Sequence, residues 1–200
     1  AVDNLKKVQS FRNQMGLVML ATTDFLELGK VEIGPAGSFY SFNSVEGSRI
    51  RFGGRTTPAF SKKITFDGYG AYGFKDRTFK YNAGVTLSLT PRTIYQFPVK
   101  SVRLSYTKDT RIPGQELQFN QSDNFFLSFK RGENDKLLIN NTLRFEYLNE
   151  FENHFSYLLG YNFTRQYPLG NLYYYKAGET PDADGRRNID ISEIYLNLRF

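Results

Sequence analysis

Residues 62–90 constrain the fold more than any other stretch of the sequence. From 79 to 89, apolar side chains stand at every odd position and polar or small side chains at every even position. A period of two is the signature of an extended strand. The same alternation runs through 64–74, and a short polar turn at 76–77 separates the two stretches. The sequence therefore predicts an antiparallel hairpin here.

The length of these strands predicts where the chain resides. Each is roughly a dozen residues long, about twice the usual strand of a soluble protein and long enough to cross a bilayer at a tilt. Similar alternation recurs along the chain. It predicts an all-β antiparallel up-and-down meander of a transmembrane outer-membrane β-barrel. The expected strands are 45–56, 62–75, 78–90, 99–108, 124–131, 136–149, 154–166 and 187–200.

The N-terminal part is less regular. We expect residues 1–29 to be a lead-in, either a short helix or irregular, and residues 30–200 to supply the barrel strands. Within the lead-in, 16–28 is compatible with helix or strand, because its apolar residues follow neither period. Residues 30–35 predict a short strand that stops at Pro35.

Bulk composition resembles that of a soluble protein, with 40% hydrophobic residues and a mean hydropathy of −0.47. No run of eighteen apolar residues could form a transmembrane helix. Barrel strands escape such averages because every second residue is polar. Aromatic residues make up 16% of the chain and gather beside the turns at 76–77 and 150–153, as interface girdles do. A soluble lipocalin-like barrel with an aromatic core is the alternative.

Charge and chemistry-bearing residues narrow the function. The net charge is +6, but the basic residues are spread over the polar faces of strands, which favours anionic outer-membrane lipid over nucleic acid as partner. His154 is the only histidine and there is no cysteine. Asp182, Asp184 and Asp190 form only part of a calcium loop. We therefore expect no enzyme activity, no cofactor and no metal.

The candidate binding residues are charged side chains on the polar faces. Arg49, Arg51 and Arg55 share one face of one strand. They either form an anion-facing stripe in the lumen or are balanced by carboxylates nearby in the sheet, namely Glu46, Asp67 and Glu146. The full set of expected lumen-facing residues is Arg49, Arg51, Arg55, Arg103, Arg144 and Glu146.

Several motifs resemble those of a Gram-negative outer-membrane β-barrel family of unassigned function. They are Gly34-Pro35 and residues 40–57, 60–63, 68–76 and 79–81; the match is densest over 33–90 and thinner from 131–135 to the end. In that family a carboxypeptidase-regulatory-like domain precedes the barrel. More distantly, the barrel is similar to the BamA/TamA-like assembly superfamily. The resemblance implies that this chain is part of a longer barrel in the outer membrane of a Gram-negative bacterium.

These observations predict an outer-membrane scaffold, or an assembly or transport component, that acts through other outer-membrane or periplasmic proteins. A small-solute pore is the second reading, and a soluble lipocalin-like ligand-binding barrel the third. We further expect an open half-barrel that later strands complete. In it, Thr86, Arg144 and Asn162 face inward, and the residues that face lipid are Val85, Leu87, Leu89, Leu143, Leu159 and Leu196.

Overall fold

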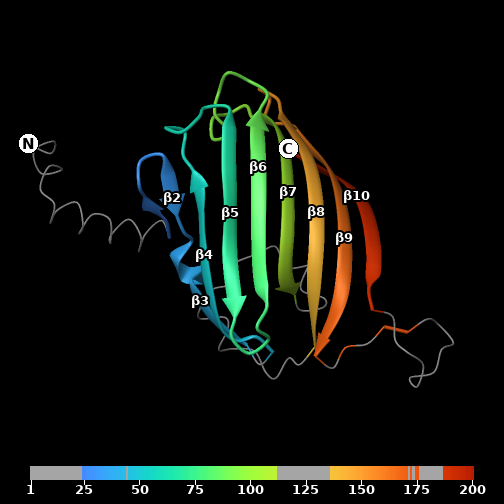
Figure 1. The fold of residues 1–200 in the computed structure, drawn as a ribbon. Helices are drawn as coiled ribbons and strands as arrows, with labels where there is room; N and C mark the ends of the chain where they lie inside the picture. The colour runs from blue at the N-terminus through green and yellow to red at the C-terminus, as the bar shows by residue number, and fades with distance from the viewer. Residues whose placement is uncertain (1–23, 44, 112–135, 171, 173, 176–186) are drawn as a thin grey trace, which may run out of the picture.

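A computed structural model of the chain describes residues 24–43, 45–111, 136–170, 172, 174–175 and 187–200. These residues form one antiparallel sheet that is not closed (Figure 1). Its strands are β1 (Leu26–Glu27), β2 (Val31–Ile33), β3 (Tyr40–Asn43), β4 (Gly47–Thr56), β5 (Ile64–Gly73), β6 (Phe79–Ser88), β7 (Lys100–Arg111), β8 (Lys136–Glu150), β9 (Ser156–Gly170) and β10 (Ile189–Arg199). A single 3-10 turn, η1 (Ala36–Ser38), interrupts the series.

The strands follow one another in a meander. From β4 to β10 every strand pairs with the strand before it in the sequence, and the order along the sheet is β1-β2-β4-β5-β6-β7-β8-β9-β10. β3 pairs with the edge of β4 that β2 leaves uncovered. Among the described strands, β10 pairs only with β9, and the sheet curls away at that edge (Figure 1). The predicted all-β, open meander is confirmed.

Most predicted strands agree with the observed ones to within a few residues. The strand expected at 124–131, and any helix before residue 24, lie outside the described residues. Two observed strands had no counterpart among the expectations, because β1 has two residues and β3 has four. Segments this short hold too few positions for an alternating pattern to be recognised.

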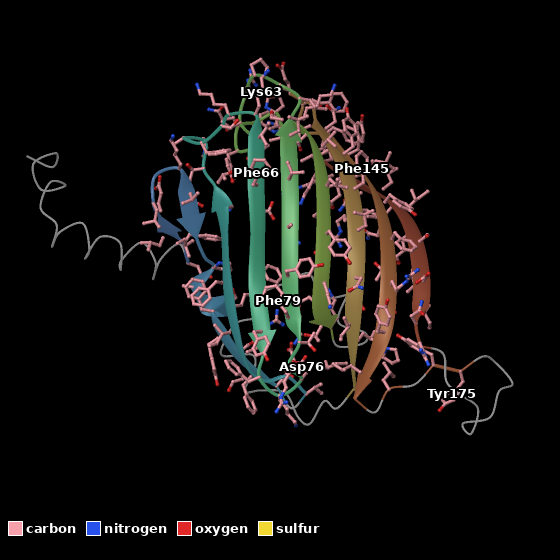
Figure 2. All side chains as sticks on the ribbon, viewed as in Figure 1. Lys63, Phe66, Asp76, Phe79, Phe145 and Tyr175 are labelled. Atoms are coloured by element: carbon pink, nitrogen blue, oxygen red, sulfur yellow. The ribbon has the colours of Figure 1, made fainter. Side chains whose placement is uncertain are left out.

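The alternation separates two faces with opposite character. The outer face carries Phe66, Leu104 and Phe145, which are about half exposed. The inner face carries Thr65, Lys80 and the other polar residues that alternate with them; Thr65 and Lys80 are buried, whereas Asp67 and Arg103 are partly buried. Figure 2 shows Phe66, Phe79 and Phe145 spread over the sheet, with Lys63 and Asp76 at opposite ends of β5.

Buried residues are mostly polar, the reverse of a soluble core. Among the described residues, the buried hydrophobic set is Ala71, Leu137 and Leu138, whereas fifteen polar or charged residues are buried. No helix within the described part of the chain is long and apolar enough to span a membrane.

Glycines allow the close approach of strands near the β2 edge. A Cβ at Gly54 would lie 2.5 Å from the backbone oxygen of Glu32 on β2, and a Cβ at Gly68 would lie 2.5 Å from the backbone oxygen of Asn82. A side chain at either position would collide with the backbone of the neighbouring strand. The two glycines are neighbours in the β4–β5 register, so together they permit a local bend in the sheet.

We predict that Gly54→Ala releases the β1–β2 hairpin from β4, because the added methyl group collides with the β2 backbone. The free energy of unfolding should fall by about 1–3 kcal/mol. Amide hydrogen exchange at Gly34, whose N–H donates to the Gly53 carbonyl of β4, should become faster. Gly70→Ala is the matched control, since its Cβ would meet only the ring of Phe79 at 3.1 Å. Equal exchange in the two variants would contradict the proposed role of Gly54.

Candidate functional site

The inner face of the sheet gathers the charged residues into a network that crosses several strands. Strands in a sheet lie about 4.8 Å apart, so partners on adjacent strands meet directly. Here the partners often belong to strands that are not adjacent. Such contacts need a concave surface, long side chains and small residues on the strand between.

One cluster lies where the β3–β4 and β5–β6 turns come together. The Lys80 ammonium on β6 is completely buried and lies 2.5 Å from a carboxylate oxygen of Glu46 and 2.5 Å from one of Asp76. Arg49 on β4 lies 3.6 Å from Glu46 and donates to Asp109 at 2.9 Å. A buried ammonium with two carboxylates is well compensated, so the cluster joins both turns to the sheet.

The Arg49–Asp109 contact shows how far these side chains reach. β5 and β6 separate β4 from β7, which amounts to about 14 Å in a flat sheet. The guanidinium passes over small residues, Ala71 and Gly73 on β5. A Cβ at Gly73 would lie 2.3 Å from the Asp76 carboxylate and 2.9 Å from the Lys80 ammonium. A methyl group at position 73 would therefore displace the Asp76 and Lys80 side chains from these positions.

A second part of the network centres on Arg103 of β7. Its guanidinium donates to both carboxylate oxygens of Asp67 on β5, at 2.5 and 2.7 Å, and to Thr86 at 3.0 Å. The side chain crosses β6 at Gly84, where a Cβ would lie 2.6 Å from an Arg103 nitrogen. Bidentate pairing of this kind fixes orientation as well as charge. Arg103 also lies 4.0 Å from Glu146 of β8.

Tyr195 extends the network to the last strand. Its hydroxyl on β10 donates to Glu146 on β8 at 2.7 Å. The ring lies across Gly160 of β9, where a Cβ would come within 2.1 Å of a ring carbon. Contacts therefore run without a break from Tyr195 through Glu146 and Arg103 to Asp67, which covers every strand from β5 to β10.

The other two arginines of β4, Arg51 and Arg55, contact different partners. Arg51 lies over the ring of Tyr69, 3.6 Å from its centroid, and Tyr69 donates to Asp109. Arg55 donates to Glu32 at 2.6 Å. Its guanidinium also stacks over Phe25, 4.3 Å from the ring centroid.

The structure distributes the six predicted site residues rather than gathering them at one point. Arg103 and Glu146 lie near each other, and Arg144 donates to the amide oxygen of Asn162 at 3.0 Å. The three arginines of β4 share one face, as expected, but point to different partners. Sequence reasoning did not identify the other members of the network, namely Glu32, Tyr69, Asp76, Lys80, Asp109 and Tyr195. The alternation in the sequence places these residues on the polar face, but it does not indicate which residues they contact.

The potential chemistry of the other singled-out residues is limited. His154 lies in the exposed β8–β9 turn and stacks on Phe97, with ring centroids 4.8 Å apart. Asp190 pairs with Arg165 at 2.7 Å, and positions 182 and 184 lie outside the described residues. Within the described ranges, no group of three or more His, Cys, Asp or Glu residues is placed to hold a metal ion.

Comparison with known proteins gives no further assignment: no family model matches the chain, and no curated protein or solved structure matches it.

We predict that Lys80→Met destabilises the fold by about 3–5 kcal/mol, because it leaves the Asp76 carboxylate without its cation and the buried Glu46 carboxylate with only the more distant Arg49. Lys63→Met is the control; Lys63 is exposed at the other end of β5, and its loss should change stability by less than about 0.5 kcal/mol. Urea unfolding followed by circular dichroism measures both. Similar losses would show that the ion cluster contributes nothing specific.

We predict strong coupling between Gly160 and Tyr195. Gly160→Ala alone should cost about 1–3 kcal/mol, because the methyl group displaces the ring and breaks its bond to Glu146. In a Tyr195→Ala background the same substitution should cost almost nothing. A double-mutant cycle of unfolding free energies measures this coupling. Additive effects would contradict the crossing geometry.

Proposed function

We propose that this chain forms part of the wall of an outer-membrane β-barrel of a Gram-negative bacterium, acting as a scaffold or an assembly or transport component rather than as a catalyst. The observation that carries the proposal is the reversed polarity of the sheet. The outer face presents large apolar side chains, such as Leu196 at 61% and Ile194 at 79% exposure, while the inner face buries ions and hydroxyls. A soluble barrel buries its apolar face instead. A membrane barrel exposes that face to lipid.

The apolar residues of the outer face form a band across the sheet. The slope of this apolar band relative to the rows of paired residues also supports a membrane location. On β5 the outer-face apolar residues extend from Ile64 to Phe74. The midpoint of this range is position 69, where the Tyr69 side chain itself lies on the inner face. Following the register row of Tyr69 across the sheet leads to Ile191 on β10. The apolar run on β10 extends from 194 to 200, so its middle lies about six residues beyond Ile191.

This displacement along the strands gives the angle between the apolar band and the rows of paired residues. Six residues correspond to roughly 20 Å along a strand, and the five strand spacings from β5 to β10 correspond to roughly 24 Å, so the band crosses the rows at about 40°. Strands of membrane barrels tilt by about 35–45° from the barrel axis. A band parallel to the membrane plane would cross the rows at this angle, which supports lipid as the environment of the outer face.

Aromatic residues border the band at both ends. Tyr72 and Phe74 pack edge to face near one turn, with centroids 5.4 Å apart. At the opposite end Phe151 stacks on Phe155, 5.9 Å apart. Aromatic rings at strand ends suit the boundary between acyl chains and headgroups.

Two features support a scaffold role. Most inner-face charges contact one another, as Arg103 and Asp67 do, which suits a rigid wall. The edge of β10 pairs with nothing among the described residues, and unpaired backbone groups are costly in lipid. The proposal therefore includes at least one further antiparallel strand at β10, and other outer-membrane or periplasmic proteins as partners.

Spin labels test the proposal directly, since the chain has no cysteine. In lipid vesicles, a label at Leu159→Cys should be accessible to oxygen and shielded from a water-soluble nickel complex, because position 159 faces outward. A label at Asn162→Cys on the same strand should be less accessible to oxygen. Preferential access of the nickel complex at position 159 would exclude a lipid environment for the outer face.

Leu87→Arg provides an energetic test. If Leu87 lies near the midplane of the membrane, the substitution should reduce the free energy of unfolding in vesicles by about 2–4 kcal/mol. Leu87→Met is the control, because it retains the volume and the apolar character. A loss below about 1 kcal/mol would place position 87 in water or at an interface.

A further inference from the structure

A row of polar side chains lies on the outer face, where apolar residues prevail. Lys108 on β7, Asn141 on β8, Arg165 on β9 and Asp190 on β10 are neighbours in the register of consecutive strands. By strand parity they belong to the face of Leu143 and Phe145, away from the inner network. They are therefore not part of the candidate site described above.

The row follows directly on the apolar band. One step nearer the middle of the sheet, β7, β8 and β9 carry Tyr106, Leu143 and Phe163, and β10 carries Ser192. On β6 the neighbour of Lys108 is Tyr81, whose ring lies 5.9 Å from that of Tyr106. A change from apolar to cationic residues beside tyrosines is the arrangement expected at the level of lipid headgroups.

The two cations differ in how they are held. Asp190 accepts from the Nε and Nη2 of Arg165 at 2.7 and 2.8 Å, which holds the guanidinium flat on the surface and leaves Nη1 outside this bidentate bond. Lys108 forms no ion pair with any of the described residues. The row thus keeps a net positive charge, and its lysine can extend along apolar surface toward the headgroup level.

We infer that Lys108 binds the phosphate of an anionic lipid headgroup beside Arg165. Their strands lie about 10 Å apart, with β8 between them, and Arg165 is held toward Asp190 on β10, so Lys108 is the cation that can extend to the phosphate. Arginine and lysine are the side chains that recognise phosphate. The inference rests on the proposed membrane location and adds a specific lipid contact to it.

The test uses the protein reconstituted in phosphatidylcholine vesicles that contain spin-labelled lipids. Electron spin resonance measures how strongly labelled phosphatidylglycerol and labelled phosphatidylcholine associate with the protein surface. The wild type should prefer phosphatidylglycerol. Lys108→Gln should reduce this preference by about two- to fivefold, because it removes the positive charge of this side chain, and Lys108→Arg should preserve it. Lys63→Gln, in the exposed β4–β5 connection, should have a smaller effect.

The outcomes separate this inference from the proposed function. If the protein immobilises phosphatidylcholine but Lys108→Gln retains the wild-type preference, the phosphate site is refuted while the membrane location stands. If neither lipid is immobilised by the wild type, the membrane location fails and the site fails with it. An equal loss in the Lys63→Gln and Lys108→Gln variants would mean that general surface charge, and not this row, attracts the lipid.

Discussion

The arrangement depends on the pairing of opposite charges across the inner face of a single sheet. The paired side chains cross intervening strands where those strands carry glycine or another small residue. Gly84 beneath Arg103 and Gly160 beneath Tyr195 provide such crossings. The positions of the glycines, the curvature of the sheet and the pairing of the ions therefore depend on one another.

The sequence predicted the features that depend on local order. Alternation along 79–89 was sufficient to place β6, its faces and its hairpin partner β5, since side-chain direction in a strand depends only on position. The open meander also followed, because each long strand pairs with its neighbour in the sequence. The two short strands β1 and β3 could not be predicted by this route. They exist because β4 offers two free stretches along one edge.

The candidate site was less predictable. Arg103 and Glu146 stood out as charges in the middle of strands, and the structure places them 4.0 Å apart. The Arg49–Asp109 pair could not be found from the sequence, because it depends on the registers of three successive strand pairs and on curvature. Alternation fixes the face of a residue, whereas long-range partners depend on how far the sheet bends.

The two edges of the sheet differ in how much continuous backbone they present. At one edge, strands of two to four residues divide the available hydrogen bonds of β4 between them and present little continuous backbone. At the other, β10 offers eleven residues of uninterrupted strand. Short edge strands are poor templates for pairing. Among the described strands, β10 therefore offers the better template for pairing with a further strand.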